Sequence, residues 1–144
     1  MPQAQSPEPK AESREPKATK PLRVVLLGFG TVGASVARIL VERPELSNRL
    51  QLTHVFNRSV TRKRADWVPS SVVWTDSFDE VLSGRPDVVV EVVGGVTPAH
   101  EWVSKAIEQG ASVVTANKML LAAHGPELLT AASRKGVRLR FEAG

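Results

Sequence analysis

The chain has 144 residues, of which 42% are hydrophobic and 24% are charged, and it contains no cysteine. This composition is typical of a globular domain with a sizeable core, and it excludes disulfides, thiol catalysis and thiolate metal sites. The longest apolar runs, such as Val24–Leu27, are too short to cross a bilayer, and the N-terminus lacks the apolar centre of a signal peptide. We therefore expect a cytoplasmic protein with no membrane partner.

The net charge of +4 raises the question of nucleic-acid binding. The basic residues are scattered, and only Arg62, Lys63 and Arg64 form a tight cluster. The chain has no tyrosine, and its few aromatic residues do not alternate with the basic ones as a base-stacking surface requires. We expect no nucleic-acid partner.

Residues 1–21 differ in composition from the rest of the chain. They hold five of the ten prolines, charges of alternating sign and almost no apolar side chain. Such a segment buries too little apolar surface to offset the entropy lost on ordering. We expect a disordered tail over residues 1–21 and one folded domain over residues 22–144.

Within that domain, short apolar runs alternate with helical patterns. The runs lack the polar alternation of a half-exposed strand, which indicates strands buried on both faces of a parallel sheet. The expected strands are Arg23–Leu27, Gln51–Phe56, Val72–Trp74, Asp87–Val93, Ala111–Thr115 and Val137–Phe141. The expected helices are Thr31–Glu42, Ser77–Leu82, Pro98–Gln109 and Pro126–Lys135.

Capping residues set the expected helix ends. Pro44 helps to stop the first helix, and Asp76 or Ser77 caps the second. Thr97 is expected to cap the third helix, with Pro98 at its first position, and Pro126 is expected to open the fourth.

Helix-linked parallel strands predict an α/β fold, a Rossmann-type doubly wound, mostly parallel sheet with helices on both faces. Ligands of such sheets bind at the carboxyl ends of the strands. Four segments fall at those ends, namely Gly28–Gly33, Asn57-Arg58, Gly94-Gly95 and Ala116–Lys118.

The first of these segments matches the dinucleotide fingerprint Gly28-x-Gly30-x-x-Gly33. The first glycine permits a tight turn, the second lets the backbone approach a pyrophosphate, and the third lets helix and strand pack closely. The motif lies between an expected strand and an expected helix, which is the context that it requires. A tight turn without a ligand is the alternative.

The end of the second strand bears on the choice of cofactor. NAD enzymes carry an acidic residue there for the ribose hydroxyls, whereas this chain has Asn57-Arg58. A guanidinium suits a 2′-phosphate, and Lys63 or Arg64 would add charge, so we expect NADP, with NAD as the second choice. A solvated loop arginine is the alternative for Arg58.

Lys118 and Glu91 are two further charged residues near the expected ligand edge. A lysine directly after a buried strand can stabilise a developing alkoxide or move a proton, or it can simply begin a helix and reach solvent. Glu91 lies in a strongly apolar strand, where a satisfied structural role is favoured over catalysis. His54, His100 and His124 show no metal-ligand spacing among themselves, and we assign none of them a catalytic role.

In order and spacing, the segments Gly28–Gly33, Asp87–Gly95, Val113–Lys118 and Phe141–Ala143 resemble homoserine dehydrogenases. The resemblance covers Leu22 to the end of the chain, and Thr115–Lys118 is its most specific part. It implies an NAD(P)-dependent oxidoreductase that interconverts L-homoserine and L-aspartate 4-semialdehyde, on the route to threonine, methionine and isoleucine.

The resemblance also implies roles for individual residues. Lys118 matches the catalytic lysine near nicotinamide and substrate, and Arg58 lies where NADP-binding members are basic. Glu142 matches the start of a loop that binds a monovalent cation such as sodium. The implied cofactor-binding residues are Gly28, Phe29, Gly30, Thr31, Val32, Gly33, Asn57, Arg58, Val93, Gly94, Gly95, Thr115, Asn117 and Lys118.

The family continues beyond the Glu142-Ala143 segment into a substrate and dimerisation domain, which these 144 residues lack. The resemblance thus implies that this chain supplies the cofactor-binding part, is inactive alone and forms a homo-oligomer only at full length. Two other hypotheses are a nucleotide-sensing module without catalysis and another small dehydrogenase, such as aspartate dehydrogenase or dihydrodipicolinate reductase. The Asn117-Lys118 pair disfavours both.

Overall fold

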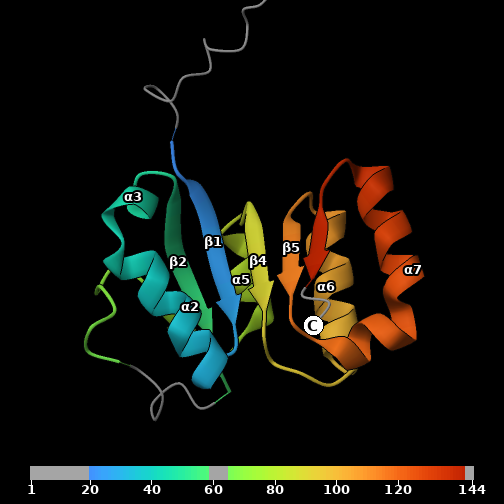
Figure 1. The fold of residues 1–144 in the computed structure, drawn as a ribbon, viewed down its shortest axis with the longest axis horizontal. Helices are drawn as coiled ribbons and strands as arrows, with labels where there is room; N and C mark the ends of the chain where they lie inside the picture. Colours follow the sequence, from blue (N-terminus) through green and yellow to red (C-terminus); the bar gives the residue numbers. More distant parts are fainter. Residues whose placement is uncertain (1–19, 59–64, 142–144) are drawn as a thin grey trace, which may run out of the picture.

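A computed structural model describes residues 20–58 and 65–141 of the chain (Figure 1). Almost all of the predicted tail lies outside the described residues, as do the Arg62–Arg64 cluster and Glu142.

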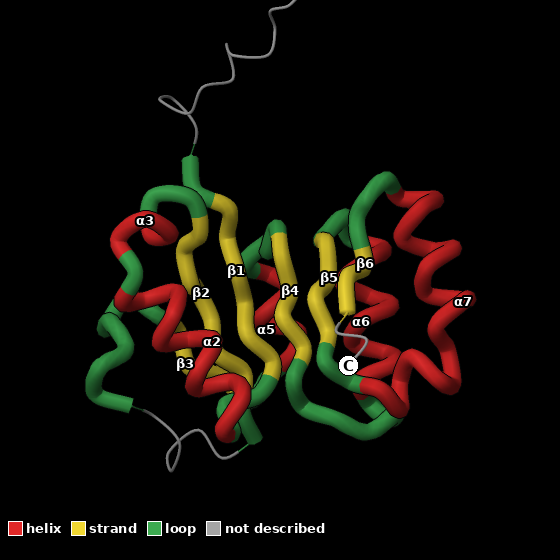
Figure 2. The backbone as a smooth tube through the Cα atoms, viewed as in Figure 1, coloured by secondary structure: helices red, strands yellow, loops and turns green. Residues whose placement is uncertain are grey.

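The core of the molecule is one parallel sheet of six strands in the order β3-β2-β1-β4-β5-β6. Figure 2 shows β3 at one end of the sheet and β6 at the other. The order confirms the predicted doubly wound α/β sheet, and every pairing is parallel. The strands are β1 (Leu22–Leu27), β2 (Leu50–Phe56), β3 (Val73–Thr75), β4 (Val88–Glu91), β5 (Ser112–Thr115) and β6 (Leu139–Phe141).

Helices cover both faces of this sheet, as predicted. In Figure 1, α2 and α3 lie in front of the sheet, whereas α5 and α6 lie behind it. The helices are α2 (Thr31–Glu42), α3 (Pro44–Ser47), α5 (Phe78–Ser83), α6 (Ala99–Glu108) and α7 (Lys118–Lys135).

Strand β1 contributes to a separate core on each face. Val24 and Leu26 pack with Ala37 and Leu40 of α2, whereas Val25 and Leu27 pack with residues of α5, α6 and α7. Successive side chains of a strand point to opposite faces of the sheet. Because both faces are covered here, successive residues of β1 must all be apolar. Each such burial contributes about 1.5–3 kcal/mol, so the unbroken apolar run is what anchors the strand.

The start of α7 was wrongly predicted at Pro126; the helix begins eight residues earlier, at Lys118. The Asn117 side chain caps it by accepting a hydrogen bond from the Leu120 N–H at 3.0 Å. Pro126 therefore lies inside the helix, where it removes one backbone hydrogen bond. Leu120 and Leu128 are buried on either side of it, and this packing outweighs the low helix propensity of proline.

The start of α6 also differs from the prediction, because Thr97 does not cap it. The helix begins at Ala99 after Pro98, and no side chain caps it. The predicted cap of α5 is confirmed, since Ser77 Oγ accepts a hydrogen bond from the Glu80 N–H at 3.2 Å. Pro44 follows the end of α2, as predicted, and it also opens the short helix α3.

The close contact between β1 and α2 predicts the effect of a methyl group at Gly33. A Cβ there would lie 2.2 Å from the Gly28 carbonyl oxygen, which is backbone and cannot rotate away. We expect Gly33→Ala to lower the free energy of unfolding in urea by about 1–3 kcal/mol. Gly30→Ala is the matched control, because a Cβ at Gly30 meets no atom within 4 Å. Equal stability of the two variants would contradict this packing argument.

Candidate functional site

The turn between β1 and α2 exposes the start of a helix at the carboxyl edge of the sheet. Gly28 has a φ of +110°, a conformation that side chains other than glycine rarely adopt, and its N–H donates to the Phe56 carbonyl at 2.9 Å. No side chain caps α2, and its first turn holds no acidic residue. The amides at this helix start, together with the helix dipole, therefore favour a bound anion such as a phosphate.

A cavity of about 430 Å³ opens beside this turn. Its walls come from the ends of β1, β2 and β4, and none of the described residues that line it is acidic. The lining residues are Gly28, Phe29, Gly30, Phe56, Asn57, Arg58, Val92, Val93 and Gly94. A smaller cavity of about 160 Å³ shares Val92 and Gly94 with it and extends the hollow to Val32, Ala116 and Asn117.

A larger hollow of about 850 Å³ lies at the opposite edge of the sheet, beside Leu22, Arg23 and Asp87. These residues stand at the starts of β1 and β4. Ligands of doubly wound sheets bind where the strands end, so the cavity of about 430 Å³ beside the glycine turn is the candidate site.

Asn57 and Arg58 directly follow β2 and line the candidate site. The Asn57 N–H donates to the Thr75 carbonyl at 2.9 Å, which fixes the backbone where it leaves the sheet. The Arg58 side chain is exposed. An exposed guanidinium at this mouth can form paired hydrogen bonds with an anionic group.

Glu91, the last residue of β4, is completely buried, and each of its carboxylate oxygens accepts hydrogen bonds. The Thr115 hydroxyl donates to Oε1 at 2.5 Å. Oε2 accepts from the N–H groups of Val93 and Gly94, at 3.1 and 3.2 Å, and from Asn117 Nδ2 at 3.3 Å. These bonds satisfy the buried charge, in line with the structural role expected from the sequence.

The same bonds explain why β4 ends at Glu91 and not at Val93 as predicted. The carboxylate accepts hydrogen bonds from the amides of Val93 and Gly94, two and three residues further along its own chain, so the backbone turns away from the sheet. Asn117 also donates to the Gly95 carbonyl at 2.5 Å, which ties the loop after β4 to the start of α7. Gly94 and Gly95 both have positive φ values in this turn, 91° and 76°.

Lys118 is the first residue of α7, and its side chain is exposed. It follows Asn117, which lines the smaller cavity, but Lys118 itself lines neither cavity at the carboxyl edge. Thr115 is buried beneath this edge, where its hydroxyl also accepts a hydrogen bond from the Asn117 N–H at 3.0 Å.

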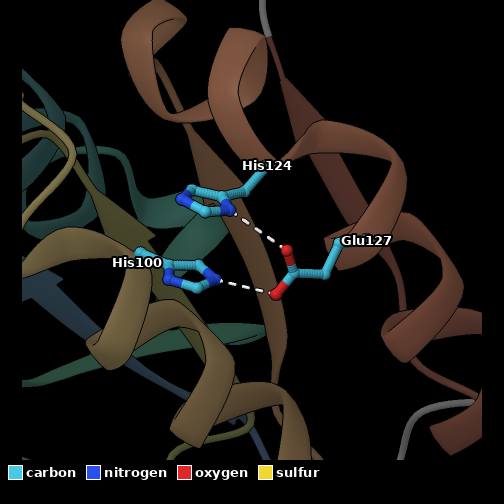
Figure 3. Close-up of polar contacts among 3 residues, drawn as sticks. All are labelled: His100, His124 and Glu127. Carbon is cyan, nitrogen blue, oxygen red and sulfur yellow. Dashed lines mark hydrogen bonds and ion pairs between the residues drawn. The ribbon is translucent and has the colours of Figure 1, made fainter.

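One cluster of polar side chains was not predicted from the sequence. His100 from α6 and His124 and Glu127 from α7 meet outside the candidate site (Figure 3). His124 and Glu127 are three residues apart in the sequence, but the predicted helix began at Pro126 and so did not include His124.

In the described part of the chain, no helix has the length and apolar character needed to cross a membrane.

The fold and the glycine turn define a dinucleotide-binding domain of the Rossmann type. A sequence profile described as "Homoserine dehydrogenase, NAD binding domain" matches residues 28–142. The chain therefore belongs to the homoserine dehydrogenase family.

Individual relatives agree with this assignment. The homoserine dehydrogenase of Pseudomonas aeruginosa is 39% identical over 127 residues, which cover 86% of this chain and 29% of the relative. A crystal structure of Staphylococcus aureus homoserine dehydrogenase superposes with a TM-score of 0.78 at 36% identity, covering 86% of this chain and 32% of that one. GenD2 from gentamicin A biosynthesis, solved with NAD, has a TM-score of 0.71 at 25% identity and covers 85% of this chain and 34% of its own.

The chain thus spans less than a third of the length of the curated relatives that it matches, at 28 to 30% of each.

The Glu91 network predicts different effects for two substitutions. Glu91→Leu removes every acceptor and leaves buried donors unpaired, each at a cost of about 1–3 kcal/mol, so we expect a loss of roughly 3 kcal/mol or more in urea unfolding. Glu91→Gln keeps one oxygen for the donors at Oε2 and can turn its amide group toward the Thr115 hydroxyl, so its loss should be smaller. Equal losses for the two variants would show that these hydrogen bonds do not hold the loops.

Proposed function

We propose that this chain is the cofactor-binding part of a homoserine dehydrogenase, which interconverts L-homoserine and L-aspartate 4-semialdehyde with a nicotinamide cofactor. The observation that carries the proposal is the uncapped helix start beside a cavity that Arg58 lines, in a chain of this family. The reaction belongs to the route to threonine, methionine and isoleucine.

The pyrophosphate of the cofactor is assigned to the glycine turn, Gly28–Gly33, and the adenosine ribose to Asn57 and Arg58. The binding of NAD by GenD2, a protein of similar fold, supports a pyridine nucleotide here. Arg58 favours NADP, because a guanidinium pairs with a 2′-phosphate and no acidic residue lines the described cavity. Val93, Gly94, Gly95, Thr115 and Asn117 are assigned to the nicotinamide end.

Lys118 is the proposed catalytic residue. When bound, the cofactor supplies the chemistry of hydride transfer. The alcohol of homoserine must also release a proton to solvent as it becomes an aldehyde, and an ammonium nearby stabilises the alkoxide that develops. Lys118 begins α7 with an exposed side chain, and it directly follows Asn117, which lines the hollow at the carboxyl edge.

Three further features belong to the proposal for the whole enzyme. The substrate is a small molecule, and most of its binding residues belong to a second domain, so the isolated chain should bind cofactor without turnover. Homo-oligomers form through that domain. Glu142, which lies outside the described residues, contributes to a site for a monovalent cation such as sodium.

The assignment of Arg58 predicts a cofactor-specific defect. Losing a charge-assisted hydrogen bond to a phosphate should cost about 1.5–3 kcal/mol in the binding of NADPH to Arg58→Ala. The binding of NADH should change little. Fluorescence titration of both cofactors against the 144-residue chain measures this, with Arg134→Ala as the control for losing an exposed arginine elsewhere. Equal losses for both cofactors would show that Arg58 does not contact a 2′-phosphate.

The assignment of Lys118 predicts a defect in turnover. In a full-length enzyme that contains this domain, Lys118→Met keeps the apolar stem, removes the charge and should lower kcat for homoserine oxidation by roughly 10²-fold. The dissociation constant of NADPH should change much less. Lys135→Met, in the last turn of the same helix, is the control.

Near-normal turnover of Lys118→Met would contradict the catalytic assignment and show that Lys118 is a solvated lysine at a helix start. A full-length enzyme that binds NADPH but never oxidises homoserine would instead support the nucleotide-sensing module.

A further inference from the structure

A second polar cluster lies between α6 and α7, formed by His100, His124 and Glu127, and none of the three lines the nucleotide cavity. Figure 3 shows the two imidazole rings one above the other, each turning a nitrogen toward the same carboxylate. His100 Nε2 lies 2.9 Å from one oxygen of Glu127, and His124 Nδ1 lies 3.0 Å from the other. Three potential metal ligands therefore converge on one point.

The positions of these side chains are set by the packing of the two helices. Val103 and Ile107 of α6 share one buried core with Leu128 of α7, so the backbones that carry the cluster are fixed relative to each other. His124 and Glu127 are three residues apart on α7 and therefore project from the same side of that helix. The two rings are parallel within 6°, with their centroids 3.7 Å apart.

The donor set suits a transition metal. Two imidazole nitrogens and one carboxylate oxygen make up the three-ligand set found at many zinc sites, where a water molecule completes the tetrahedron. Metal–ligand distances of about 2.0–2.2 Å place tetrahedral ligand atoms roughly 3.3–3.5 Å apart. One donor atom from each of the three residues lies within 4.8 Å of the others, so small side-chain rotations bring them to that spacing.

We propose that His100, His124 and Glu127 form a site for a divalent transition metal of the Zn²⁺ class, separate from the nucleotide cavity. The side chains of the two histidines are 31% and 30% exposed, and that of Glu127 is 58% exposed, so an ion can enter from solvent and keep a water ligand. The inference does not depend on the proposed dehydrogenase function.

Calorimetric titration of Zn²⁺ into the untagged 144-residue chain tests the proposal. We expect one saturable Zn²⁺ site per chain at neutral pH. Glu127→Gln removes the carboxylate with almost no change of shape, and His100→Phe keeps a ring to stack on His124 while removing its nitrogens. Each variant should weaken Zn²⁺ binding by at least roughly 10–100-fold, since even residues that only support a ligand have effects of this size.

Glu101→Gln is the matched control, because Glu101 is an exposed carboxylate on α6 next to His100 and pairs with Lys105. It should bind Zn²⁺ like the wild type. The visible absorption spectrum of bound Co²⁺ gives a second measurement that needs no variant, since tetrahedral nitrogen and oxygen ligation has an intense and distinct spectrum.

Two results would overturn the proposal. One is the absence of saturable Zn²⁺ binding and of a tetrahedral Co²⁺ spectrum in the wild type, which would leave the cluster as a hydrogen-bonded link between two helices. The other is equal Zn²⁺ affinity in the wild type, Glu127→Gln and His100→Phe, which would place the ion elsewhere on the chain.

Discussion

The buried carboxylate of Glu91 is the interaction on which the candidate site depends. A charge without any exposure is costly, and it persists only because four hydrogen-bond donors surround it. Two donors belong to the turn after β4, one is the hydroxyl of Thr115 at the end of β5, and one is the side chain of Asn117, which precedes α7. The carboxylate therefore fixes the shape of both loops at once, and with them the position at which α7 begins. A network of this kind makes the edge of the sheet rigid without a ligand.

Much of this arrangement was predictable from the sequence, because the strands of a sheet covered on both faces must be apolar at successive positions. β1 and the following glycine turn were recognised for that reason, and Gly33 shows why the motif needs its last glycine: a side chain would meet the carbonyl of Gly28. The candidate cavity lies beside this turn, where the strand pattern predicted it, and Asn57 and Arg58 line it.

The errors arise where tertiary contacts override a local signal. Pro126 usually marks a helix start, but burial of Leu120 and Leu128 on either side extends α7 through it, and Asn117 serves as the cap. The cluster of His100 with His124 escaped the sequence analysis for a related reason. The two residues are far apart in the chain, and only the packing of α6 on α7 brings their rings together.

The electrostatics of the carboxyl edge follow from the same elements. α2 and α7 both begin there, neither has an acidic residue in its first turn, and a helix start carries a partial positive charge. Arg58 and Lys118 add full positive charges at two of the strand ends. The buried carboxylate of Glu91 is turned inward beneath this edge, and its oxygens are occupied by donors. Its negative charge is therefore used to shape the loops, while the surface above it presents donors and positive charge to an anionic ligand.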